Sequence, residues 1–150
     1  MIGRFERFSI MLTEVTKHWN KIASDEMEQY GLNGCHAVYL TILNQYEEGI
    51  TAAKLGELCY KDKSDVSRMI SVMEKKGLVK KERVHKNFYR ALLKLTDDGK
   101  QAADLVQERA MKAVEVAGKG ISEEKREVFY QVLRQISDNL QVISKEGLPQ

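Results

Sequence analysis

The sequence predicts a mainly α-helical protein with one small β-hairpin, and three observations lead to this fold class. The only proline, Pro149, lies next to the C-terminus, so no proline interrupts the interior. Apolar residues recur at helical spacing through most of the chain. Directly after Gly77 the spacing shortens to about 2 residues in two short runs, which is typical of strands. With 43% hydrophobic and 31% charged residues, the 150 residues are expected to fold as a single unit, residues 1–150.

Two helices are expected first. The first runs from about residue 2 to residue 29, and turn residues at 30–34 end it. One face of this helix carries an apolar row: Phe8, Leu12, Val15, Trp19 and Ile22. The second helix is expected from about residue 34 to residue 48, with Gly49 ending it.

Two shorter helices are expected next. Thr51 is a candidate N-terminal cap for a helix that ends near Cys59, and Asp62 for one that ends at Gly77. In the second of these helices, Asp65 lies in the first turn, where a negative charge suits the helix dipole. Its expected buried stripe consists of Val66, Met69, Ile70 and Met73.

A hairpin and two long helices complete the order. The strands are expected at residues 78–84 and 89–95, with the polar turn 85–87 between them. Thr96 is the expected cap of a helix that reaches Ala117, and Ser122 caps the last helix. Apolar residues of the last helix repeat at helical spacing: Phe129, Val132, Leu133, Ile136, Leu140 and Ile143.

Residues 32–96 therefore have the plan of a winged helix-turn-helix, in which the last helix before the hairpin enters a DNA major groove. On a helical wheel, the face opposite the buried stripe carries a polar outer row: Ser64, Arg68, Ser71 and Lys75, flanked by Ser67 and Asp65. Arginine, serine and aspartate can all read base edges. The alternative is an ordinary solvated helix face.

The distribution of charge favours DNA. The chain carries a net charge of +2, but residues 61–94 hold eleven Lys/Arg against four Asp/Glu, a local charge of +7. The remaining residues hold thirteen against eighteen, a charge of −5. Positive charge concentrated in one short stretch is typical of a nucleic-acid contact.

The segments KSDVSRMISVMEKKGLV and LKLTDDG resemble the MarR family of bacterial transcriptional regulators, and the order of elements resembles that family over nearly the whole chain. The resemblance implies a homodimer. In it, residues 1–30 and 97–146 would form N- and C-terminal dimerisation helices around the winged helix-turn-helix domain at 32–96. The apolar residues of the last helix fit this arrangement, although packing within one chain would also bury some of them.

The resemblance also implies a set of DNA contacts. Ser64, Asp65, Ser67, Arg68 and Ser71 match the groove-facing positions, and Lys63 and Lys75 are the expected phosphate partners. The wing departs from the family, whose Asp-Arg-Arg-like run aligns here with residues 87–89. Asn87 brings no charge, so Lys86 or Arg90 is expected to replace the usual minor-groove arginine, or the wing contacts phosphates alone.

Many family members are released from DNA by a small aromatic acid or by cysteine oxidation. A small aromatic or lipophilic effector would bind where the dimerisation helices meet the winged domain. The candidate contacts there are His18, Trp19, His36 and Tyr39, with ordinary packing as the alternative for each. The peroxide-sensing members carry a cysteine in the first helix, and this chain has its cysteines at positions 35 and 59 instead. We expect both to be reduced.

The expected function is that of a dimeric, ligand-responsive repressor that binds a pseudo-palindromic operator in double-stranded DNA. The sequence has no phosphate-binding loop, no HExxH and no nucleophile elbow, so no enzyme activity and no cofactor are expected. The three histidines lack metal-ligand spacing. No apolar run reaches about 18–20 residues, and we expect a cytoplasmic protein. The alternative function is a winged-helix scaffold that binds proteins without specific DNA binding.

Overall fold

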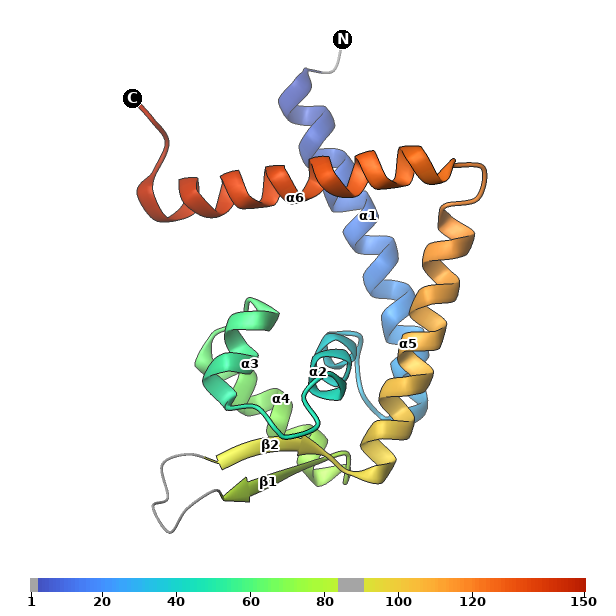
Figure 1. Cartoon of the computed structure of the whole chain (residues 1–150), viewed down its shortest axis with the longest axis vertical. Coiled ribbons are helices and arrows are strands. Elements are labelled where there is room, and N and C mark those ends of the chain that lie inside the picture. Colours follow the sequence, from blue (N-terminus) through green and yellow to red (C-terminus); the bar gives the residue numbers. More distant parts are fainter. Residues whose placement is uncertain (1–2, 84–90) are drawn as a thin grey trace. The chain divides into compact units, whose positions relative to one another are not determined.

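The computed structural model describes residues 3–83 and 91–150, and within them the chain is mainly helical with one hairpin, as predicted (Figure 1). In chain order the elements are α1 (Arg4–Met27), the short 3-10 helix η1 (Glu28–Tyr30), α2 (Cys35–Asn44), α3 (Ala52–Cys59), α4 (Lys63–Lys75), β1 (Val79–Arg83), β2 (Ala91–Leu95), α5 (Asp97–Ala117) and α6 (Glu123–Glu146). The chain divides into two compact units, Met1–Met111 and Lys112–Gln150, and the boundary falls within α5.

The four predicted helix caps are confirmed. Each capping oxygen accepts a hydrogen bond from the amide three residues later: Thr51 from Lys54 (3.2 Å), Asp62 from Asp65 (2.8 Å), Thr96 from Gly99 (3.0 Å) and Ser122 from Lys125 (3.3 Å). The caps satisfy amides that have no partner within the helix, so they fix where α3, α4, α5 and α6 begin.

The predicted end of α2 is wrong, because the helix stops at Asn44 and not near residue 48. The chain leaves the helix early so that Ile50 can pair with β2. The amide of Ile50 donates to the carbonyl of Leu93 (3.1 Å), and the amide of Leu93 donates to the carbonyl of Ile50 (2.8 Å). Gly49 stands in this turn with a φ of +94°, and it does not cap the helix.

The core of the first unit lies between α2, α3, α4 and the hairpin. The side chains of Tyr39, Leu40 and Leu43 on α2 are fully or almost fully buried. Strands β1 and β2 are antiparallel, with register Val79↔Leu95 to Arg83↔Ala91. The first turns of α5 add small buried residues and one larger one: Ala102, Ala103 and Val106. This packing holds α4 with one face against the core and the other in solvent.

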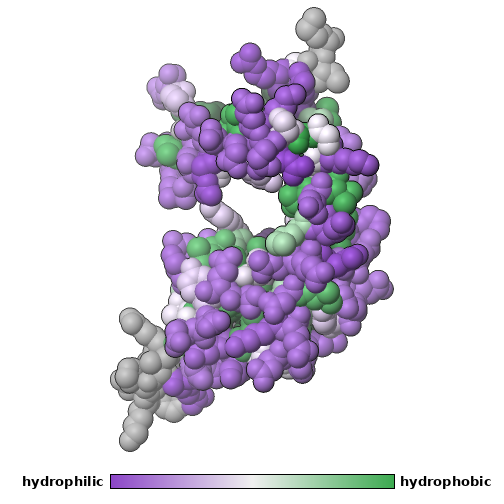
Figure 2. All heavy atoms as spheres, turned by 45° about the vertical axis from the view of Figure 1, so that its right-hand side comes forward, coloured by the Kyte–Doolittle hydropathy of each residue, from purple (hydrophilic) through white to green (hydrophobic). Residues whose placement is uncertain are grey.

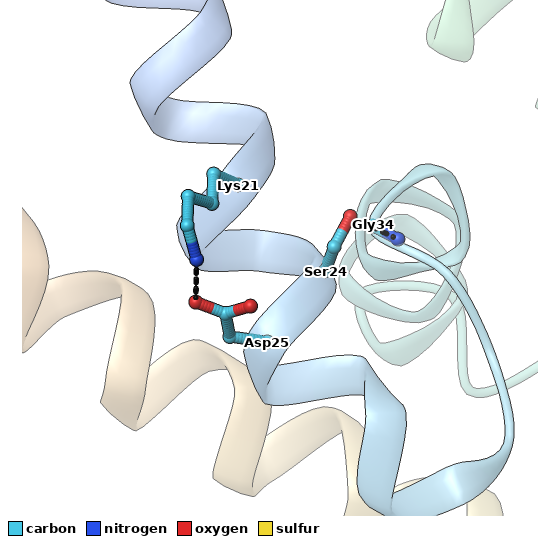
Figure 3. Close-up of polar contacts among 4 residues, drawn as sticks. All are labelled: Lys21, Ser24, Asp25 and Gly34. Carbon is cyan, nitrogen blue, oxygen red and sulfur yellow. Dashed lines mark hydrogen bonds and ion pairs between the residues drawn. The ribbon is translucent and has the colours of Figure 1, made fainter.

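The start of α2 approaches α1 closely (Figure 3). The hydroxyl of Ser24 accepts a hydrogen bond from the amide of Gly34 at 3.2 Å. A Cβ atom at position 34 would lie 2.7 Å from the Ser24 hydroxyl and 2.9 Å from the Ser24 amide, so only glycine fits here without a shift. Nearby, Lys21 Nζ lies 2.8 Å from Asp25 Oδ2, and this hydrogen bond raises the pKa of Lys21.

In the second unit, Arg126 joins the two helices at their turn. Its Nη2 donates to the carbonyl of Gly118 (2.7 Å), and its Nε donates to the carbonyl of Ile121 (3.3 Å). None of the 24 residues of α6 is buried. Within its own unit, therefore, the apolar row of α6 has no core to pack against.

The predicted apolar row of α1 is exposed as well: Phe8, Leu12, Val15, Trp19 and Ile22 are between 38% and 61% exposed. Patches of hydrophobic side chains interrupt the mostly hydrophilic surface in Figure 2. Large exposed apolar surfaces are unusual on monomers and typical of interfaces. No helix in the described residues has the length and apolar composition needed to cross a bilayer.

Candidate nucleic-acid interface

Helix α4 has the two faces that the sequence predicts. Val66, Ile70 and Met73 are buried to 3% exposure or less and fix the inner face. Met69, predicted to be buried with them, is only partly buried at the edge of that face. The predicted outer row is exposed in full: Ser64, Arg68, Ser71 and Lys75, together with Lys63 in the first turn. Of the two flanking residues, Ser67 is exposed and Asp65 is half-buried. The burial of the inner row sets the rotation of α4 about its axis, so the outer row points to solvent as one surface.

Asp65 and Arg68 form an ion pair one turn apart on α4. The Asp65 side chain is 32% exposed and the Arg68 side chain is 69% exposed. The carboxylate of Asp65 thus lies beside the Arg68 guanidinium at the outer face. A guanidinium presents its donors as a planar fork, which matches the two acceptors on the major-groove edge of guanine.

The hairpin places more positive charge beside α4. Lys80 and Lys81 are exposed on β1, and Lys81 Nζ lies 4.0 Å from Glu74 Oε1 at the end of α4. On the neighbouring strand Lys94 Nζ lies 2.6 Å from Glu82 Oε2. The hydrogen bond between them lowers the pKa of Glu82 and raises the pKa of Lys94, so both stay charged over a wide pH range.

A groove of about 460 Å³ lies between α3, α4 and the hairpin. Val66, Ile70 and Leu93 line its apolar part, and Lys61, Lys63 and Lys81 contribute ammonium groups to its lining. Lys61 and Lys63 bring positive charge to the first turn of α4, and Lys81 adds a third ammonium group from β1. Such a surface is suited to the negative backbone of a nucleic acid.

The predicted wing contacts lie outside the described residues. Lys86, Asn87 and Arg90 all fall within positions 84–90. The replacement for the usual wing arginine therefore stays a prediction.

The four predicted effector contacts lie in two different settings. His18 and Trp19 are on the exposed part of α1, where His18 Nε2 lies 4.0 Å from Glu14 Oε1. His36 and Tyr39 are buried on α2 at 4% and 0% exposure. Among the described residues, His36 Nε2 and the Tyr39 hydroxyl have no hydrogen-bond partner. Burial lowers the pKa of His36 and raises the pKa of Tyr39 to about 12.

The two cysteines differ in environment. Cys35 is exposed at the start of α2, and Cys59 is buried at the end of α3. Burial raises the pKa of the Cys59 thiol to about 11, so at neutral pH this side chain is protonated and weakly nucleophilic. The structure thus agrees with an ordinary core role for Cys59.

Two features of this surface are absent from the sequence-based prediction. The first is the pairing of Asp65 with Arg68, which the spacing of three residues on a helix could have indicated. The second is the backbone of Tyr60, which has a φ of +54° in the turn between α3 and α4. No sequence signal marks this position, because glycine and asparagine are the residues expected there.

Comparison with known proteins gives no matching family model. A curated relative, the organic hydroperoxide resistance transcriptional regulator of Bacillus subtilis (strain 168), is 35% identical over 69 residues. The matched segment covers 45% of this chain and 47% of the relative. The match therefore spans about half the length of that protein.

Solved structures match over most of the chain. A MarR protein from Peptoclostridium difficile has a TM-score of 0.84 at 19% identity, covering 93% of this chain and 92% of that one. A putative MarR family transcriptional regulator from Listeria monocytogenes, complexed with a 26mer DNA, has a TM-score of 0.78 at 22% identity, covering 100% and 99%. The MepR–DNA complex of S. aureus has a TM-score of 0.81 at 16% identity, covering 88% and 97%.

These similarities and the geometry of α4 with its hairpin define the class of fold, which is a winged helix of the kind found in transcriptional regulators. Within this class the fold is that of solved MarR-family structures, so the fold that the sequence resemblance implies is confirmed.

Proposed function

We propose that the protein is a sequence-specific DNA-binding transcriptional regulator. The observation that carries this proposal is the outer row of α4, where Arg68 is exposed between serines and is paired with Asp65. The surrounding segment, residues 61–94, has a net charge of +7. In a winged helix this surface enters the major groove, and an arginine there distinguishes guanine from other bases. That two proteins of the same fold carry DNA in their structures supports the proposal.

The regulator is proposed to act as a homodimer. The apolar rows of α1 and α6 support this, because both are exposed in the single chain: Trp19 is 43% exposed and Phe129 is 57% exposed. A second copy would cover these rows and remove them from water. A two-fold dimer binds a pseudo-palindrome whose half-sites lie about 10 bp apart, one turn of the DNA helix.

More specifically, we propose that the protein is a repressor that responds to a small aromatic or lipophilic effector. His36 Nε2 and the Tyr39 hydroxyl on α2 have no hydrogen-bond partner among the described residues, so a polar group of a ligand could bind to them. The exposed position of Trp19 on α1 gives it the large apolar face such a ligand needs. Because its target is chromosomal DNA, the protein is expected to work in the cytoplasm.

A gel-shift series tests the proposal. The purified protein is titrated onto duplex DNA from its own upstream region and onto random duplex of equal length, at several salt concentrations. We expect tighter binding to the upstream DNA and a steep loss of affinity with salt, because several phosphates are neutralised. Equal affinity for both duplexes would reject specific binding, and a flat salt dependence would favour a protein-binding scaffold instead.

A further inference from the structure

Three helices of the first unit end with the same pair of backbone hydrogen bonds, known as a Schellman motif. After α1 and η1, Leu32 N donates to Met27 O (3.2 Å) and Gly31 N to Glu28 O (2.9 Å). After α4, Leu78 N donates to Met73 O (2.9 Å) and Gly77 N to Glu74 O (3.0 Å). After α3, Lys61 N donates to Gly56 O (2.9 Å) and Tyr60 N to Glu57 O (3.3 Å).

In this motif one residue has a left-handed backbone, and at the end of α3 this residue is not a glycine. Gly31 and Gly77 occupy this position after η1 and α4, with φ values of +65° and +73°. Tyr60 occupies it after α3, with a φ of +54°, and no other non-glycine residue has a positive φ in the described part of the chain. A Cβ atom in this conformation crowds the backbone, so glycine would form the same turn at lower cost.

Packing does not explain the tyrosine. The Tyr60 side chain is 82% exposed, more than any other large hydrophobic or aromatic residue in the described part of the chain. A side chain that stabilises the folded state through burial would lie against the core, as Tyr39 does at 0% exposure. Tyr60 therefore combines an unfavourable backbone conformation with an aromatic ring in solvent. Strain of this kind is commonly retained at functional positions.

The position of Tyr60 in the fold indicates what function its side chain has. It lies in the turn that leads into α4, two residues before the capping residue Asp62. Lys61 and Lys63 follow it at once, and the outer row begins at Ser64. The first turn of a recognition helix is the part nearest to DNA, so the preceding turn faces the sugar-phosphate backbone at the edge of the groove.

We infer that the Tyr60 hydroxyl donates a hydrogen bond to a phosphate oxygen of DNA beside the recognition helix. Tyrosine is among the side chains that contact phosphates, and such contacts fix the orientation of a protein on the duplex. The inference rests on the proposed DNA-binding function and adds a positioning contact to it. Since phosphates are the same at every base pair, Tyr60 contributes equally to specific and non-specific binding.

The test uses two substitutions of the full-length protein, Tyr60→Phe and Tyr60→Gly, with fluorescence anisotropy of labelled upstream and random duplex. Tyr60→Phe removes the hydroxyl alone. Each protomer loses one hydrogen bond, worth roughly 10-fold, so we expect the dimer to lose roughly 100-fold in affinity for both duplexes. Because the hydroxyl is neutral, the slope of affinity against salt should stay at the wild-type value. Tyr130→Phe on α6, where the side chain is 51% exposed, is the matched control and should bind as the wild type does.

Tyr60→Gly separates a DNA contact from a structural role. We expect this variant to unfold at a higher urea concentration than the wild type, because glycine relieves the left-handed backbone, and yet to bind DNA more weakly. If the unmodified protein binds the upstream DNA and both Tyr60 variants bind it with the same affinity, the Tyr60 contact is overturned but the proposed function is not. Weaker binding together with lower stability in Tyr60→Gly also overturns it, since that result indicates a structural residue. A wild-type protein that does not bind DNA overturns both this contact and the proposed function.

Discussion

Substitution of Arg68 is the most direct way to test whether the outer row of α4 reads bases. The folded state should tolerate Arg68→Ala, because the Arg68 side chain is 69% exposed and its one described ion pair is with Asp65. Exposed pairs of this kind contribute about 0.2–1 kcal/mol to stability. The unfolding midpoint in urea should therefore move little, and any large effect on DNA binding has its origin at the interface.

The expected effect on specific binding follows from the geometry of the fork. One arginine bound to a guanine contributes about 1–3 kcal/mol of discrimination. A dimer on two half-sites makes this contact twice, so the operator affinity should fall by about 2–6 kcal/mol, which is roughly 30-fold at the least. Affinity for random duplex should fall much less, because it loses only one positive charge per protomer.

The assay is anisotropy on both duplexes with Arg68→Ala and Arg68→Lys side by side. Arg68→Lys keeps the charge and removes the planar fork, so it should bind random duplex as the wild type does and lose most of the operator preference. Lys63→Ala serves as the phosphate control and should weaken both duplexes alike. If Arg68→Ala weakens both duplexes by the same factor, Arg68 contacts the backbone and the base-reading argument is refuted.

Three further predictions concern assembly, pH and stability. Leu133→Asp on α6 should give a monomer in light scattering with unchanged helix content. The control Gln131→Asp, on the opposite face of the same helix, should stay a dimer. A Leu133→Asp protein that is still dimeric would show that the interface lies elsewhere. Because burial lowers the pKa of His36, its contribution to stability is fully present above about pH 6.5 and is lost as the pH falls toward the folded pKa. Urea midpoints between pH 7 and pH 5 should thus fall more steeply for the wild type than for His36→Leu, and parallel curves would contradict a neutral buried His36. Thr96→Val removes two hydroxyl hydrogen bonds, one to the Gly77 carbonyl just after α4 and one from the Gly99 amide that caps α5. This loss should cost about 1–2 kcal/mol in urea denaturation, whereas Thr96→Ser should retain most of the stability. Equal midpoints for Thr96→Val and the wild type would show that these bonds add nothing.

The local chemistry of the helix ends made much of the fold predictable. Thr51, Asp62, Thr96 and Ser122 each cap the helix that the sequence assigns to it, because a capping oxygen and the amide it accepts from are close in the chain. The end of α2 was not predictable in the same way. It depends on the pairing of Ile50 with Leu93, which are distant in the sequence.

In the candidate site, too, the features set by local sequence were predictable and those set by long-range packing were not. The rotation of α4 followed from the spacing of Val66, Ile70 and Met73, so its outer row was correctly predicted as exposed. The different settings of Trp19 and His36 depend on how whole helices pack, which residue spacing on a single helix does not encode. The left-handed backbone of Tyr60 was unpredictable for another reason, since it runs against the intrinsic preference of the residue.

Thr96 links α4, the hairpin and α5, which bears on how these three elements move. Its hydroxyl donates to the carbonyl of Gly77 at 2.6 Å and accepts from the amide of Gly99 at 3.0 Å, so a single oxygen atom is bonded to the end of α4 and to the start of α5. The backbone amide of Thr96 also donates to the carbonyl of Leu78 at 3.0 Å, where the chain enters β1. The end of α4, the base of the hairpin and the first turn of α5 are consequently connected by three hydrogen bonds through one residue, Thr96. If α4 binds DNA as proposed, we expect a signal that reorients this helix to turn the hairpin base and the start of α5 with it.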